Sequence, residues 1–133
     1  QLKISASPGT VLPLFAGAAG KVLNAAKTNE SVIKLIRENG LPQHTSRSIV
    51  NEAAYLAELE QVRLKQFSVD HEEYLTGVSA VAVALQNLKG PPMAVWSVGL
   101  SSHMAPVKIE ASIGLMSVAA EKLRDALDKT SGY

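Results

Sequence analysis

The sequence predicts one α/β (α+β) domain in which a mostly antiparallel sheet is flanked by helices. Apolar residues recur at helical spacing in four segments, near residues 16–26, 31–39, 52–65 and 106–129. Short runs rich in Val, Ala and Phe, at 67–69, 78–85 and 93–100, are typical of strands. The length of 133 residues is that of a single domain with one core.

The first twenty residues lead from a strand into a helix. Leu2–Ser5 reads as part of a strand, and Ser7-Pro8-Gly9 is a turn. Leu12–Leu14 is extended, and the small residues Ala16–Gly20 open a helix. Because the chain begins inside a strand and without Met, we expect an N-terminally incomplete fragment.

Polar caps delimit the next two helices. Asn29 caps a helix that starts at about Ser31, and Asn39-Gly40 ends it. Asn51 caps the third helix. The apolar stripe expected on that third helix consists of Ala53, Leu56, Leu59 and Val62.

The second half predicts a hairpin followed by a long helix. The runs 78–85 and 93–100 are nearly all apolar, so we expect both faces of both strands to be covered. Residues 87–92 form the turn between them. Pro106 starts the last helix, which runs to about Lys129.

Composition excludes several classes of function. Thirteen basic and twelve acidic residues leave no surplus for holding nucleic acid. There is no Cys and no apolar run long enough to span a membrane, which is compatible with a cytoplasmic protein. Because His44, His71 and His103 lack metal-ligand spacing, and no phosphate-loop or nucleophile-elbow motif occurs, we expect no metal, no cofactor and no catalytic residue.

Three places could bind a ligand, and each has a purely structural alternative. The helix start at Ala16–Gly20 offers backbone N–H groups to an anion, although small residues also permit tight packing. Asp70–Glu73 could bind a metal or do acid–base work, or could be a solvated turn or a helix cap. Ser97, with Gly99 on the same strand face, could form a pocket wall, or could bond the backbone beside a bulge.

Taken together, these segments resemble the isocitrate-lyase-regulator (IclR) family of bacterial transcription regulators. Residues 12–21, LPLFAGAAGK, are similar to the family's LPxHxTAxGK. Residues 56–73 resemble LxELxxIRxxGYAxDxEE, residues 77–83 resemble GVRCIAA, and residues 97–104 resemble SVSGPxSR. The four segments occur in the family's order and cover nearly the whole chain.

The resemblance implies that residues 1–133 are a GAF/PAS-like effector-binding domain without its winged helix-turn-helix. It also implies a small carboxylate or aromatic effector, assembly into homodimers or homotetramers, and contact with DNA only through the absent N-terminal domain. By correspondence with the family, the pocket residues are Ile4, Ala18, Ala19, Asp70, Val78, Ala80, Ser97 and Gly99.

The chain departs from the family pattern where polar residues are common. Ala80 stands in place of Cys, and Gly99 in place of a second Ser. Phe15 stands where the family usually has His, and Gly17 stands where it usually has Ser or Thr. Met104 stands where it usually has Arg. We therefore expect a roomier, more apolar pocket and a ligand larger than a short keto acid, such as an aromatic carboxylate.

The leading expectation is a non-enzymatic sensor in which ligand orders the Asp70 loop against the helix start. Two alternatives remain open at this point. One is an oligomerisation module whose pocket holds no ligand, and the other is a small hydrolase that uses the Asp70–Glu73 cluster.

Overall fold

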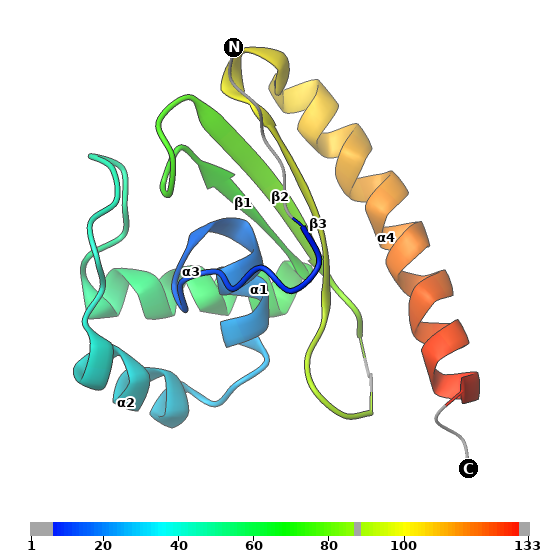
Figure 1. Cartoon of the computed structure of the whole chain (residues 1–133), viewed down its shortest axis with the longest axis horizontal. Helices are drawn as coiled ribbons and strands as arrows, with labels where there is room; N and C mark the ends of the chain where they lie inside the picture. The colour runs from blue at the N-terminus through cyan, green and yellow to red at the C-terminus, as the bar shows by residue number, and fades with distance from the viewer. Residues whose placement is uncertain (1–6, 87–88, 131–133) are drawn as a thin grey trace.

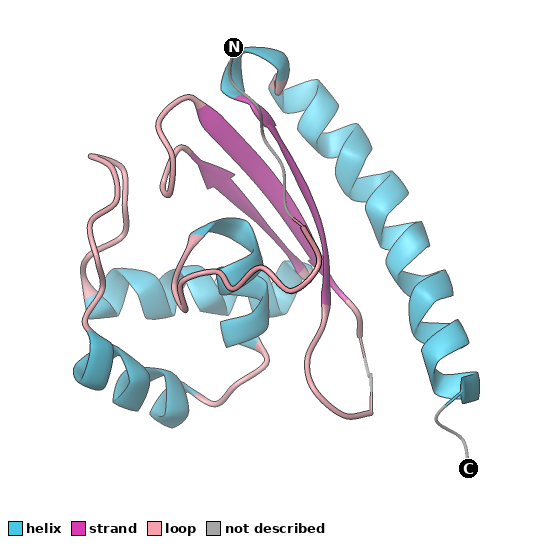
Figure 2. Cartoon of the chain, in the orientation of Figure 1, coloured by secondary structure: helices cyan, strands magenta, loops and turns pink. Residues whose placement is uncertain are grey.

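The computed structural model describes residues 7–86 and 89–130, and it confirms the α+β class (Figure 2). The main elements, in chain order, are α1 (Gly17–Ala25), α2 (Asn29–Asn39), α3 (Glu52–Lys65), β1 (Phe67–His71), β2 (Val78–Ala84), β3 (Ala94–Leu100) and α4 (Pro106–Thr130). A short 3-10 turn, Ser101–His103, joins β3 to α4. The strand predicted at Leu2–Ser5 lies outside the described residues, as does part of the predicted 87–92 turn.

The three strands form one antiparallel sheet in the order β1-β2-β3. Asp70 of β1 pairs with Ala80 of β2, and Ala80 pairs in turn with Val98 of β3. The hairpin predicted between the last two strands is therefore confirmed. Because directly paired residues share a face, this register decides which side chains lie on each side of the sheet.

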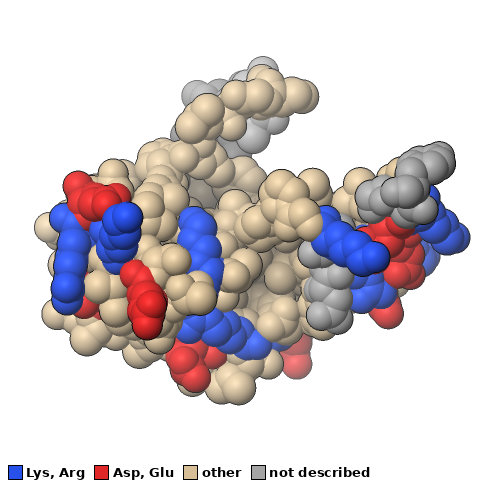
Figure 3. All heavy atoms as spheres, turned by 90° about the horizontal axis from the view of Figure 1, so that it is seen from below, with Lys and Arg blue, Asp and Glu red and all other residues tan. Residues whose placement is uncertain are grey.

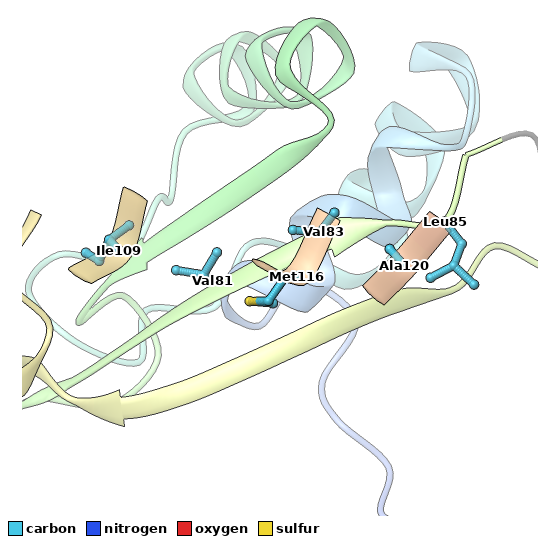
Figure 4. Close-up of a cluster of buried hydrophobic side chains, with 6 residues drawn as sticks. All are labelled: Val81, Val83, Leu85, Ile109, Met116 and Ala120. Atoms are coloured by element: carbon cyan, nitrogen blue, oxygen red, sulfur yellow. The ribbon is translucent and has the colours of Figure 1, made fainter. Parts of the chain in front are cut away.

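The helix α4 covers one face of the sheet, and α1 and α3 cover the other (Figure 1). The long α4 lies along one face, where Ile109, Met116 and Ala120 pack on three residues of β2 and its end, Val81, Val83 and Leu85 (Figure 4). The opposite face packs on α1 and α3, through Ala18, Val22 and Val62 against Ala80 and Ala82. Small residues on this second face let the α1 backbone approach the sheet.

Two details of the helices differ from the sequence predictions. The cap of α2 is Thr28, whose side chain accepts the Ser31 N–H, while Asn29 is already helical. Asn51 caps α3 as predicted. On α3 the buried residues are Tyr55, Leu59 and Val62, whereas Ala53 is exposed. Tyr55 is buried because it packs against the buried apolar residues of α2.

The two strands of the hairpin differ in burial, which corrects one prediction. The six residues from Val78 to Val83 are all buried, as expected for a central strand. Residues of β3 are only half-buried, and Ser97 is exposed. The reason is position, because within the described part of the chain β3 pairs with β2 alone and is an edge strand.

The surface is mixed in charge and apolar in places. Seen from below, side chains of both signs gather over the α2 side and at the C-terminal end of α4 (Figure 3). On α4 the exposed apolar residues are Val107, Leu115, Val118 and Leu123. Among the described helices, none is long and apolar enough to cross a bilayer.

Candidate functional site

A cavity of about 130 Å³, partly open to solvent, lies where the start of α1 meets the sheet. Its walls come from the segment before α1, from β1 and the loop after it, and from β2 and β3. The lining residues are Thr10, Leu12, Ala16, Gly17, Asp70, Tyr74, Leu75, Val78, Ala80, Trp96 and Val98. Three of the predicted site residues, Asp70, Val78 and Ala80, therefore come together in one cavity.

Among the described residues that line this cavity, Asp70 is the one that carries a charge, and its side chain is nearly buried (5% exposed). Its Oδ1 accepts the Glu73 N–H at 2.7 Å. Burial raises the pKa of Asp70 above its ordinary value, while the hydrogen bond from Glu73 opposes that rise. The site thus holds a carboxyl group that is costly to ionise and faces apolar walls.

The first residue of α1 fits closely against this carboxyl group. Gly17 has a φ of +58°, and a Cβ at Gly17 would lie 2.7 Å from Asp70 Oδ2. Any L-side chain here would meet both a disfavoured backbone conformation and a collision. Glycine at this position is therefore a requirement of the contact between α1 and Asp70.

The start of α1 presents backbone donors without a side-chain cap. The N-cap residue Ala16 offers no side-chain acceptor, and Gly20 is the first residue that donates within the helix, to Ala16 O. The N–H groups of Gly17, Ala18 and Ala19 thus lack intrahelical partners, as at any helix N-terminus. The Ala18 and Ala19 side chains themselves are buried and do not line the cavity.

Lys21, one turn further along α1, fixes the loop that carries Asp70. Its ammonium group donates to Glu73 Oε2 at 3.0 Å, Glu58 Oε1 at 3.2 Å and Val69 O at 2.9 Å. The three donors of a lysine are thereby all used. Since Glu73 also donates its N–H to Asp70, Lys21 and Asp70 are joined through Glu73.

The loop of residues 44–48 forms hydrogen bonds to the loop after β1. Thr45 Oγ1 donates to Glu72 O at 2.6 Å, and Ser48 Oγ donates to Glu73 O at 2.7 Å. His44 makes an edge-to-face contact with Tyr74, which lines the cavity. The walls formed by the loop after β1 are consequently tied to residues 44–48.

Ser97 and Gly99 are not brought to this cavity. Ser97 pairs with Val81, whose side chain packs under α4, so Ser97 lies on the opposite face of the sheet from Asp70. A Cβ at Gly99 would meet Met104 Sδ at 3.0 Å, so this glycine makes room for Met104 rather than for a ligand. Ile4 lies outside the described residues.

The residues of β3 that do line the cavity are Trp96 and Val98. If the family's Ser-Val-Ser-Gly is aligned so that its glycine falls on Gly99, its two serines correspond to Trp96 and Val98. Because side chains alternate along a strand, the predicted pair, Ser97 and Gly99, lies on the face of β3 opposite the cavity.

The groove beside β1 and the two glutamates after Asp70 differ from this cavity, because the groove is open and the glutamates already have partners. A groove of about 400 Å³ runs beside β1, but it is open, and its charged lining includes the paired Lys21, Glu58 and Glu73. Glu72 Oε1 accepts the Gly77 N–H, so both glutamates after Asp70 have structural partners. Among the described residues, no group of three or more His, Asp or Glu side chains is arranged for a metal ion.

This fold and site define a class, the C-terminal domain of a bacterial transcriptional regulator. A family model described as the IclR C-terminal domain of bacterial transcriptional regulators matches residues 1–130. The chain belongs to the IclR family, which confirms the resemblance seen in its motifs.

Known relatives agree with this assignment. The chain is 31% identical over 128 residues to the HTH-type transcriptional repressor AllR of Escherichia coli K12, covering 96% of the chain and 47% of that protein. The chain thus spans about half the length of the curated relatives that it matches.

Two solved structures have the same fold. A transcriptional regulator of this family from Alicyclobacillus acidocaldarius matches with a TM-score of 0.84 and 28% identity, over 96% of the chain and 51% of that structure. A double mutant of the inducer-binding domain of the transcription factor PobR from Acinetobacter, in complex with 3-hydroxybenzoic acid, matches with a TM-score of 0.80 and 29% identity, over 92% of the chain and 74% of that structure.

Proposed function

We propose that this chain is the ligand-sensing domain of a regulator and binds a small carboxylate or aromatic metabolite in the Asp70 cavity. The observation that carries the proposal is a mostly apolar cavity with a buried carboxyl group beside an uncapped helix start. The double mutant of the PobR inducer-binding domain, whose structure holds 3-hydroxybenzoic acid, supports it by analogy.

The signal would leave the cavity through the loop after β1. Tyr74 and Leu75 line the cavity, and the same loop is tied to α1 by Lys21 and to residues 44–48 by Thr45 and Ser48. A ligand that prefers one arrangement of this loop shifts its population. In a full-length cytoplasmic regulator, assembled as a homodimer or homotetramer, that shift would alter DNA binding by the separate N-terminal domain.

The test is a thermal-shift panel with 3-hydroxybenzoate, benzoate, pyruvate and glyoxylate. A ligand that binds only the folded state raises Tm, by an amount that grows with the ratio of ligand concentration to Kd. We expect a rise with at least one aromatic acid, and none with D70A. If no compound raises Tm, the domain is not a sensor for these classes.

An oligomerisation module without a ligand is the second candidate. The observation in its favour is the exposed apolar surface of α4, formed by Val107, Leu115, Val118 and Leu123. It predicts concentration-dependent association without any ligand response. Sedimentation velocity of the wild type and of L115E would separate the two functions, because L115E leaves the cavity untouched.

A further inference from the structure

The outer edge of β1 carries backbone groups that can pair with another strand. Within the described part of the chain, β1 pairs with β2 alone. The Ala84 N–H donates to Gln66 O, so along this stretch the backbone groups of the even-numbered residues point toward β2. The backbone groups of Phe67, Val69 and His71 therefore point away from the sheet. An edge of this kind is a template for an added strand.

Side chains from outside β1 cap two of these outward groups. Lys21 Nζ donates to Val69 O at 2.9 Å, and the His71 N–H donates to Glu73 Oε2 at 3.1 Å. The two caps also bind each other, because Lys21 Nζ donates to Glu73 Oε2 at 3.0 Å. The lysine side chain is 3% exposed and the glutamate side chain 15% exposed. The edge is thus capped by one donor and one acceptor that hold each other in place.

The caps stand in the space that an added strand would use. A groove of about 400 Å³ runs beside β1, and Phe67, Val69 and His71 all line it. The backbone of an added strand would lie about 4.8 Å from that of β1. Lys21 and Glu73 line the same groove, so they meet the incoming backbone as well as occupying its hydrogen-bond partners.

A second copy of this chain presents a backbone that matches this edge. Antiparallel pairing of two β1 strands about Val69 places Phe67 opposite His71 of the other copy, and Val69 opposite itself. Donors then meet acceptors, because a two-fold axis sets identical edges against each other. The caps on Val69 O and on the His71 N–H remove most of these bonds. Only the bond from the Phe67 N–H to the His71 carbonyl remains on each side.

We propose that Lys21 and Glu73 keep the β1 edge closed, and that without these caps two copies of the chain associate through β1. The buried ion pair thereby has a role besides stability, because it stops the sheet from continuing into the next molecule. Charged side chains at sheet edges are a known means of preventing such association. The inference is independent of what the cavity binds and of the exposed face of α4.

The experiment compares the association of the wild type, E73A and E73Q by sedimentation velocity over a range of concentrations. E73A removes the acceptor of the His71 N–H, whereas E73Q keeps an oxygen there and should behave as the wild type. We expect E73A to raise the association constant about tenfold, because each dimer gains the bond at His71 twice. E38A is the matched control, since Glu38 is exposed and pairs with Lys34 on α2. It should change nothing.

A second variant frees the other capped group. K21M/E73Q removes both buried charges together, which avoids leaving either one unpaired, and it uncaps the Val69 carbonyl. It should associate more strongly than the wild type, as E73A does. The urea transition of each variant shows that it is folded, so that association is not mistaken for aggregation of unfolded chains.

Proline at position 69 shows whether the association uses this edge. Because the Val69 N–H points away from β2, V69P removes no bond of the β1–β2 ladder but blocks strand addition. E73A/V69P should return to the wild-type association. E73A/L115E should still associate through β1, because Leu115 lies on α4.

Three results would overturn the inference. The first is that neither E73A nor K21M/E73Q associates more strongly than the wild type. The second is that V69P leaves the association of E73A unchanged, which would place the contact elsewhere. The third is that V69P alone weakens association of the wild type, which would show that the β1 edge is already open.

Discussion

The ammonium group of Lys21 lies 2.8 Å from Oε1 of Glu73, and the lysine side chain is 3% exposed. A buried charge of this kind is tolerated because Glu58, Glu73 and the Val69 carbonyl satisfy its donors. The pair joins α1 to the loop that forms one wall of the cavity. Removal of this ion pair should therefore lower both the free energy of unfolding and the affinity for a ligand.

Lys21→Met should lower the free energy of unfolding by about 3 to 5 kcal/mol, because it leaves the largely buried Glu73 carboxylate without its cation. Urea denaturation measures the change. Lys34→Met is the matched control: Lys34 and its partner Glu38 are both exposed, and the loss should stay within about 0.5 kcal/mol. The double variant K21M/E73Q should recover part of the loss, and no recovery would contradict the assigned pairing.

Gly17→Ala should destabilise the domain more than an ordinary glycine substitution at positive φ. The new Cβ would collide with Asp70 Oδ2 in addition to straining the backbone. We expect a loss of about 2 kcal/mol or more, together with weaker ligand binding. Gly77→Ala is the control, because Gly77 has a φ of +81° and open space around it. Equal losses for the two variants would show that contact with Asp70 is unimportant.

Asp70→Asn should change how stability depends on pH. Burial raises the folded-state pKa of Asp70, so between the unfolded and folded pKa values the folded state binds more protons than the unfolded state. The contribution of Asp70 to the free energy of unfolding therefore falls as pH rises through this window. We expect D70N to gain stability relative to the wild type from about pH 4 upward. Parallel pH profiles for the two proteins would refute the raised pKa.

Tyr55 should titrate far above an ordinary tyrosine. Burial raises its pKa to about 12, and the hydrogen bond from Asn24 Nδ2 at 3.0 Å opposes the rise. Absorbance at alkaline pH should therefore show one of the three tyrosines of the chain ionising late, and that step should be missing in Y55F. Since the folded pKa is raised, stability falls as pH increases above about 10.

Local sequence signals predicted the elements well. Asn51 before α3, Pro106 at the start of α4 and the glycine after α2 each mark a boundary that the structure confirms. These signals work because capping and proline geometry depend on a few neighbouring residues. One cap was predicted wrongly, because Asn29 was expected where Thr28 caps α2. The two residues are adjacent and both are good capping residues, so the error is a single position.

The candidate site was only partly predictable. The motifs identified Asp70, Val78 and Ala80, which the fold does bring together. Trp96 was missed, although a large aromatic among small residues on a strand was a visible signal. The contacts of Lys21 with Glu58 and Glu73 span 37 and 52 residues, and no local pattern encodes such separations.

The sequence by itself determined the class of fold, the family and the identity of most elements, because these follow from periodicity, caps and motifs along the chain. Only the tertiary structure decided which face of β3 meets the cavity. Strand side chains alternate, so the pairing of Ala80 with Val98 turns Trp96 and Val98 toward Asp70 and turns Ser97 away. The chemistry of the site depends on that register.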